Sequence, residues 1–251
     1  GAELANIICQ GSSAIWVLNY FLGGKSLLKI RKENLKLKKD IVKEIISIGL
    51  APFSMQIASS MLNVLLNNSL KKYGGDIAIS SMGVINSITM LVLMPIFGIN
   101  QGAQPIIGYN YGAKHYDRVK ETLKLAILSA TVIVTIGFIF AQTIPEKLIS
   151  LFIKNDKELI EVAVKGLRID FAMFPIIGFQ IVSSNYFQAT GKPRQAMFLS
   201  LSRQVLMLIP ALIILPKFFQ LTGVWLALPV SDITSSILTA IFLIKDIKNI
   251  G

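Results

Sequence analysis

Residues 98–120, GINQGAQPIIGYNYGAKHYDRVK, interrupt the apolar character of the chain and set its organisation. Uncharged apolar segments lie on both sides, at residues 77–99 and 126–144. Within the stretch, glycines permit tight turns, Pro105 ends or kinks a helix, and amide side chains satisfy the backbone groups that such breaks release. The basic residues near its end place the stretch in water. The pattern predicts a short loop that joins two membrane-spanning helices on one side of a bilayer.

The amino-acid composition indicates a membrane protein. Of the 251 residues, 53% are hydrophobic and 16% are charged, whereas soluble domains have about 25% charged residues. The formal net charge is +11, and the basic residues lie in short blocks between apolar segments. The positive-inside rule predicts this distribution for cytoplasmic loops. Nucleic-acid binding, which needs basic residues on one folded face, is therefore disfavoured.

Apolar segments recur along the chain and predict an all-α protein that crosses the membrane several times. They lie at residues 5–22, 45–70, 77–99, 126–144, 168–189, 195–215 and 223–244. Most approach the ~20 residues that a helix needs to span a bilayer. Residues 23–43 carry eight basic residues against Glu33 and Asp40, which predicts a cytoplasmic loop. Residues 71–76 predict an outer turn, and residues 145–161 predict a short amphipathic helix at the outer interface.

The stretch 98–120 also resembles a known family. Its pattern G-x-x-Q-G-x-Q-P-x-x-[GS]-x-N-x-G-A-x is similar to that of the multidrug and toxic compound extrusion (MATE) transporters. The motif residues are Gly98, Gln101, Gly102, Gln104, Pro105, Asn110 and Gly112. Similar patterns occur at the G-A-x-x-A start, at G-x-x-P (49–52), at F-Q-A-x-G-K-P (187–193) and at G-x-W-x-A-x-P-x-S-D (223–232).

The resemblance implies a domain organisation. MATE proteins have twelve helices in two six-helix bundles that face each other around a cavity. Residues 1–22 then match the last transmembrane helix of the N-terminal bundle, residues 23–44 a basic cytoplasmic linker, and residues 45–251 the C-terminal six-helix transmembrane bundle. The chain is accordingly expected to be a C-terminal fragment, multi-pass in the plasma (inner) membrane, with a cytoplasmic C-terminus. Its partners would be the bilayer and the missing N-terminal bundle.

The resemblance also implies a function. MATE proteins are secondary active antiporters that export organic, often cationic, drugs by alternating access in exchange for Na⁺ or H⁺, with no other cofactor. A lipid-linked precursor or polysaccharide flippase of the same superfamily is the first alternative, which a basic cavity floor and a hydrophobic groove would favour. A structural or signalling membrane protein that binds partners through its basic linker is the second. Two opposed six-helix halves in the complete gene would argue against it.

The sequence offers no catalytic or metal-binding constellation. It has one histidine, His115, and one cysteine, Cys9, which cannot make a zinc site from different helices. No GxSxG or HExxH pattern occurs. No catalytic residue and no metal ligand are therefore expected, and an enzyme is disfavoured.

One departure from the family pattern concerns the coupling ion. Sodium-coupled MATE proteins carry one carboxylate in the first helix of the second bundle and another in its fourth helix. The matching positions here are near Ser60 and near Phe179 and Gln180, which are not acidic. The resemblance then implies that the coupling acid lies in the missing N-terminal bundle.

Polar residues within the apolar segments are candidates for lining a substrate cavity. Gln56, Asn63 and Asn67 are spaced seven and four residues apart and share one helix face. They either bond to neighbouring helices or face a cavity. Met90 could adapt to varied drugs or serve ordinary packing. The complete candidate set is Gln56, Asn63, Asn67, Met90, Gln180 and Asn185.

Ionisable residues inside a bilayer are costly and indicate a function or a partner. Arg203 lies roughly 12 Å, and Asp232 roughly 18 Å, from the inner end of its predicted helix, at 1.5 Å per residue. Because the arginine stem can cover this difference, we expect an intramembrane Arg203–Asp232 pair that ties the last two helices together. The competing hypothesis makes Asp232 a proton or sodium site. Asp170, close to Arg168 near the outer boundary, is predicted to be a solvated charge.

Overall fold

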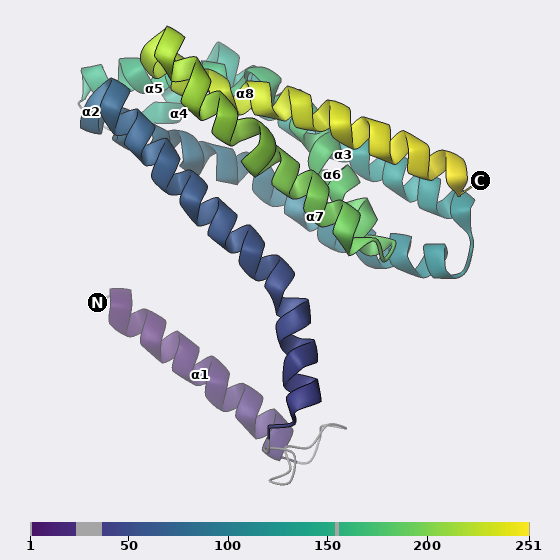
Figure 1. Cartoon of the computed structure of the whole chain (residues 1–251). Helices are drawn as coiled ribbons and strands as arrows, with labels where there is room; N and C mark the ends of the chain where they lie inside the picture. The colour runs from purple at the N-terminus through teal and green to yellow at the C-terminus, as the bar shows by residue number, and fades with distance from the viewer. Residues whose placement is uncertain (1, 24–36, 154–155, 251) are drawn as a thin grey trace. The chain divides into compact units, whose positions relative to one another are not determined.

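The computed structural model describes residues 2–23, 37–153 and 156–250, and these residues contain helices and no strands. The predicted all-α class is confirmed. The chain divides into two units, residues 1–51 and 52–251. In the first unit, α1 (Ala2–Leu22) is one continuous helix (Figure 1). Most of the predicted basic linker lies outside the described residues.

Three helical stretches of the described residues are long and apolar enough to cross a membrane. They are Gln56–Gly112, Tyr116–Thr143 and Pro193–Asn249. The first belongs to α2 (Lys39–Gly112), and the second is α3 (Tyr116–Thr143). The third joins α7 (Pro193–Leu201), the π-helix η3 (Ser202–Leu208) and α8 (Ile209–Asn249). These stretches support a membrane protein that crosses the bilayer several times.

The first and third stretches each contain a break in helical geometry. Gly75 in α2 has φ 67° and ψ −160°, a conformation that glycine adopts at little cost, and it lies in the predicted 71–76 turn. Gln220 in α8 has φ 51° and ψ −130° and lies between two predicted helices. Figure 1 shows the green-to-yellow α8 turning back on itself before it runs to the C-terminus. The breaks therefore divide apolar stretches that would otherwise be too long for one crossing.

The loop predicted from the motif stretch is wrong for most of its length. Helix α2 continues through Pro105 to Gly112, and only residues 113–115 separate it from α3. Ile96, Ala103 and Ile107, spaced seven and four residues apart, are buried on one face of this helix. This packing outweighs the helix-breaking tendency of Pro105. All seven motif residues therefore lie on a helix.

The segment between α3 and the next long helix also differs from the prediction. In place of one amphipathic helix over residues 145–161, α4 (Pro145–Ser150) is followed by α5 (Lys157–Asp170). The Asp156 carboxylate caps α5 by accepting a hydrogen bond from the Leu159 amide at 3.0 Å. The 3₁₀ turn η2 (Phe171–Met173) then leads into α6 (Phe174–Ala189). The end of α5 therefore lies within the bundle.

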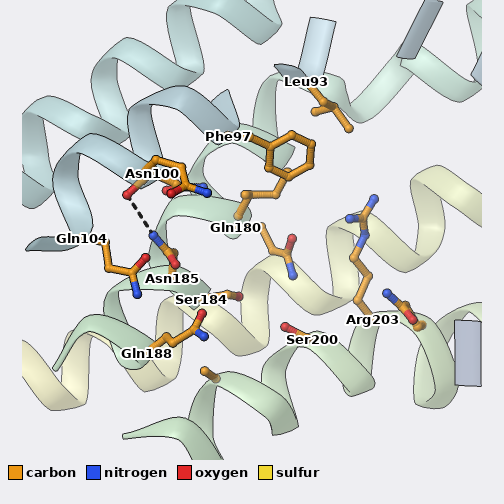
Figure 2. Close-up of a pocket in the computed structure, with 14 residues that line it drawn as sticks. Leu93, Phe97, Asn100, Gln104, Gln180, Ser184, Asn185, Gln188, Ser200 and Arg203 are labelled. Atoms are coloured by element: carbon orange, nitrogen blue, oxygen red, sulfur yellow. Dashed lines mark hydrogen bonds between the residues drawn. The ribbon is translucent and has the colours of Figure 1, made fainter. Parts of the chain in front are cut away.

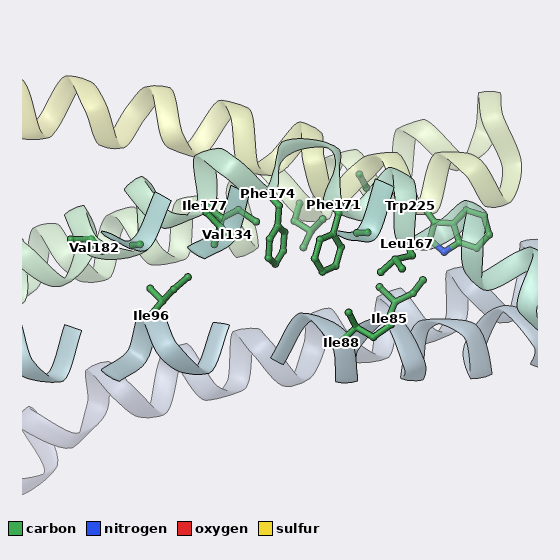
Figure 3. Close-up of a cluster of buried hydrophobic side chains, with 14 of the residues drawn as sticks. Ile85, Ile88, Ile96, Val134, Leu167, Phe171, Phe174, Ile177, Val182 and Trp225 are labelled. Carbon is green, nitrogen blue, oxygen red and sulfur yellow. The ribbon is translucent and has the colours of Figure 1, made fainter. Parts of the chain in front are cut away.

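An apolar core forms in the second unit where α2, α3, α5, α6 and α8 meet (Figure 3). The rings of Phe171 and Phe174 stack with centroids 4.0 Å apart at its centre. Helices α3 and α6 approach each other closely at Gly178. A Cβ atom there would lie 2.9 Å from the carbonyl carbon of Ala130. Only glycine allows this approach, which resembles the small-residue contacts of membrane helices generally.

Gly178→Ala is expected to destabilise the full-length protein by about 1–3 kcal/mol, because the added methyl group forces two helix backbones apart. The melting temperature of the purified protein measures the effect. Gly83→Ala is the matched control, since a Cβ at Gly83 meets nothing within 4 Å and alanine favours helix. Equal melting temperatures for the two variants would contradict the close packing.

Candidate functional site

An open pocket of about 610 Å³ lies in the second unit, lined by α2, α6, α7 and η3 (Figure 2). Its lining residues are Leu93, Phe97, Asn100, Gln101, Gln104, Gln180, Ile181, Ser184, Asn185, Gln188, Ala196, Ser200, Arg203 and Gln204. Amide side chains predominate, while Leu93 and Phe97 provide an apolar wall. Arg203 is the one charged residue among these described residues. The pocket therefore combines many hydrogen-bonding groups with little net charge.

Two polar atoms of residues that line the pocket have no hydrogen-bond partner in the described part of the chain. The Asn185 side chain donates to the Asn100 carbonyl at 3.4 Å, the dashed contact of Figure 2. The buried Asn100 Oδ1 and Ser184 Oγ atoms have no hydrogen-bond partner within the described ranges. Buried polar atoms without a partner cost free energy. Both atoms have almost no accessible surface, so surrounding protein atoms cover them and a ligand in the pocket does not contact them directly.

The structure places the six predicted cavity residues in three different environments. Gln180 and Asn185 line the pocket, whereas Gln56, Asn67 and Met90 are exposed on the second unit and do not line it. Asn63 lines a smaller pocket of about 260 Å³, to which Arg203 and Asp232 also belong.

The motif residues Gln101 and Gln104 line the larger pocket although the sequence assigned them to a loop. Asn100, Ser184 and Gln188 line it too and were missed. A helical signal was present, because Asn100 and Gln104 are four residues apart, and so are Gln180, Ser184 and Gln188.

The structure brings Arg203 and Asp232 together. Arg203 Nε donates a hydrogen bond to Asp232 Oδ1 at 2.7 Å, and the Asp232 side chain is 5% exposed. Arg203 lies in the π-helix η3, where the Ser231 hydroxyl donates to its main-chain carbonyl at 2.7 Å. π-Helical turns are rare and occur often at functional sites. The two bonds connect η3 to α8 beside both pockets.

Asp170 is buried, and the prediction of a solvated charge is wrong. Asp170 is 8% exposed, because it is the last residue of α5 and this end of the helix lies within the bundle. The Thr89 hydroxyl donates a long hydrogen bond of 3.5 Å to its carboxylate. The ion pairs in the described part of the chain are Lys192–Asp246 and Arg203–Asp232, so Asp170 has no cationic partner there. It is a further candidate for a functional ionisable group.

A polar cluster joins three helices at one end of the second unit. Lys192, in the turn before α7, forms an ion pair with Asp246 of α8, and the Tyr186 hydroxyl donates to Asp246 at 2.9 Å. The Lys192 ammonium also lies 5.3 Å from the centre of the Tyr111 ring. Burial favours the neutral amine, but the interactions with Asp246 and Tyr111 together outweigh this effect and raise the pKa of Lys192. Lys192 of the F-Q-A-x-G-K-P motif therefore helps to hold the end of α8 against the turn between α6 and α7.

Known proteins resemble the chain over its whole length. Multidrug export protein MepA of Staphylococcus aureus (strain N315) is 28% identical over 248 residues, which are 98% of this chain and 54% of that protein. The solved structure of the MATE multidrug transporter DinF-BH is 41% identical, with a TM-score of 0.80, and the match covers 98% of this chain and 55% of that one. An inward-facing multidrug resistance MATE family transporter has the same fold, with a TM-score of 0.84 at 18% identity over 100% of this chain and 58% of that one.

The chain spans about half the length of the relatives it matches. These relatives are transporters, so the chain is not an enzyme. A family model described as MatE matches residues 53–213, more than half of the chain. The resemblance read from the motif stretch is thereby confirmed, and the chain belongs to the MatE family.

Proposed function

We propose that the chain is the C-terminal half of a secondary active exporter of organic drugs, and that the 610 Å³ pocket is this half's share of the substrate cavity. The pocket carries the proposal because its amide groups and apolar wall can bind chemically varied molecules. Polar groups that fix orientation within an apolar site are typical of small-molecule sites. The names of the relatives support export of drugs.

The charge of the pocket indicates which interactions bind a substrate in this half. Arg203 lines the pocket, but its charge is compensated by Asp232. A cationic drug therefore meets no net repulsion here, and binding relies on amide hydrogen bonds and on contact with Phe97 and Leu93. No Asp or Glu is among the described residues that line this pocket, so a carboxylate that binds a cationic drug directly is proposed to lie in the other half of the cavity.

Residues 1–22 and 23–44 are proposed as the last helix of the N-terminal bundle and the cytoplasmic linker, with residues 45–251 as the C-terminal six-helix bundle. The coverage of the relatives supports this division, since the match extends over 98% of the chain. The distribution of basic residues supports a cytoplasmic C-terminus in the plasma membrane. The N-terminal bundle is the proposed partner that closes the cavity.

Export is proposed to be coupled to Na⁺ or H⁺ entry. A coupling site needs an ionisable group that can change its occupancy inside the membrane. Asp170 meets this requirement in the C-terminal half, because it is buried and has no cationic partner among the described residues. Asp170 is therefore a second candidate for the residue that binds the coupling ion, besides the acidic residue expected in the N-terminal bundle.

Asn185→Leu in the full-length protein is expected to lower the efflux of a fluorescent organic cation from drug-sensitive bacteria by roughly twofold to twelvefold. The loss of one hydrogen bond of about 0.5–1.5 kcal/mol gives this range. Asn68→Leu is the matched control, because Asn68 is exposed and outside the pocket. Equal efflux by the two variants, at equal expression, would remove the pocket from the substrate path.

Imposed gradients separate the exporter from the flippase. Efflux by the native full-length protein that stops when one gradient is removed identifies both an exporter and its coupling ion. A well-expressed protein without efflux under either gradient supports the lipid-linked precursor or polysaccharide flippase instead. Translocation of such a precursor in reconstituted vesicles is the direct test of that alternative.

A further inference from the structure

A second, strongly apolar groove lies between α3 and α8, near the end of the bundle where α3 begins and α8 ends. It has a volume of about 440 Å³, within the ~300–1,000 Å³ range of ligand sites. Leu123 and Ile127 of α3, with Leu243 and Ile247 of α8, line it. Helices α3 and α8 each pack closely on α6 rather than on each other. The groove therefore remains open between them.

Two lysines are part of the same groove. Lys120 and Lys124 are four residues apart on one face of α3, and both line it, whereas no acidic residue does. The ion pairs of the described ranges involve Lys192 and Arg203, so no carboxylate neutralises the two groove lysines there. Lysine stems can lie along apolar surface while the ammonium groups remain at the polar edge. The groove thus combines an apolar channel with two cationic groups.

We propose that this groove binds one anionic phospholipid, with an acyl chain along the apolar side chains and the phosphate at Lys120 and Lys124. Basic pockets between membrane helices bind anionic lipid headgroups in this way. The occupant is a lipid rather than the same groove of a second copy of the chain, because the second groove would bring two more lysines, whereas an anionic headgroup complements the positive charge. The site is separate from the drug pocket, which is lined by α2, α6, α7 and η3.

Native mass spectrometry of the purified full-length protein tests the site. The protein is equilibrated with equal amounts of phosphatidylglycerol and phosphatidylethanolamine, and the retained lipid is counted. We expect one retained phosphatidylglycerol, and a loss of affinity of roughly tenfold to thirtyfold in Lys120→Gln/Lys124→Gln. Lys120→Arg/Lys124→Arg is expected to retain it. Glycerol phosphate, which has the headgroup chemistry without the acyl chain, is expected not to be retained.

Two further variants distinguish the groove from general surface charge. Lys71→Gln/Lys72→Gln removes the same charge from exposed positions of α2 and is expected to leave lipid retention unchanged. Leu128→Trp keeps both lysines but fills the groove from a side chain that is 58% exposed, and is expected to abolish retention without affecting folding.

Each of four outcomes would overturn the proposal. They are an equal loss of lipid in the α2 control pair, equal retention of phosphatidylethanolamine, full retention in Leu128→Trp, and a dimer that the groove variants dissociate. None of these readouts depends on transport. A failed lipid site is therefore distinguishable from a failed export function.

Discussion

Arg203→Leu is expected to destabilise the full-length protein by less than about 3–5 kcal/mol, the usual cost of removing one partner from a fully buried ion pair, because the Arg203 side chain is 30% exposed. The variant leaves the nearly buried Asp232 carboxylate without the Arg203 Nε–H donor that lies 2.7 Å away. A nearly buried carboxylate without its partner must either stay ionised at a cost in free energy or take up a proton. The midpoint of SDS-induced unfolding and the melting temperature measure this effect.

A double-mutant cycle separates the ion pair from the loss of arginine packing. Asp232→Asn keeps an oxygen acceptor for Arg203 and is expected to cost less than Arg203→Leu. Arg203→Leu/Asp232→Asn is expected to recover more than half of the loss, because no unpaired charge remains. If Arg203→Leu were as stable as the native protein, the pair would have no structural role. The proton- or sodium-site hypothesis for Asp232 would then be favoured.

The Arg203–Asp232 contact could be predicted from the sequence, because the prediction needed only the bounds of two apolar segments and the rise per residue of an α-helix. The two apolar segments fixed how far each residue lies from its helix end, and 1.5 Å per residue converts position into depth. The break at Gly75 lies in the predicted 71–76 turn, and the break at Gln220 lies between the predicted segments 195–215 and 223–244. These features depend on local sequence and bilayer thickness, both of which a single sequence contains.

The prediction of a loop for the motif stretch was wrong because its composition is typical of a loop, whereas its buried residues have the spacing of a helix. Glycine, proline and amide residues are common in loops, yet Ile96, Ala103 and Ile107 repeat with helical spacing and are buried. A helix that is packed on several neighbours tolerates Pro105. The loop prediction overlooked the spacing of the amide residues. Asn100 and Gln104 are four residues apart, so on a helix they share one face, and both line the pocket.

Asp170 was misjudged for a different reason. Its neighbour Arg168 is charged and exposed, and a short charged segment precedes both, so local sequence favoured water. The burial of Asp170 arises because α5 and η2 lead directly into α6, against Thr89 of α2, 81 residues earlier in the chain. A contact between residues so far apart in sequence cannot be read from local patterns.

If Asp170 binds the coupling ion, Asp170→Asn is expected to lower gradient-driven efflux at least tenfold. Folding and drug binding are expected to stay intact. Asparagine has the shape of aspartate and can still accept a hydrogen bond from Thr89, but it cannot take up a proton or attract sodium. The expected signature is therefore selective: the melting temperature and the drug affinity stay near native values, while transport no longer responds to the imposed gradient. Efflux from proteoliposomes under separate sodium and proton gradients measures it.

The control for this change is Asp76→Asn, which removes the same charge from an exposed residue. It is expected to transport like the native protein. Native-like coupled efflux by Asp170→Asn would assign coupling to the N-terminal bundle, as the non-acidic Ser60 and Gln180 positions first suggested. Loss of both stability and drug binding would instead make Asp170 a structural residue, because a coupling acid can be neutralised without unfolding the bundle. A buried carboxylate without a cationic partner in the described structure is costly to maintain, and ion binding during transport would account for that cost.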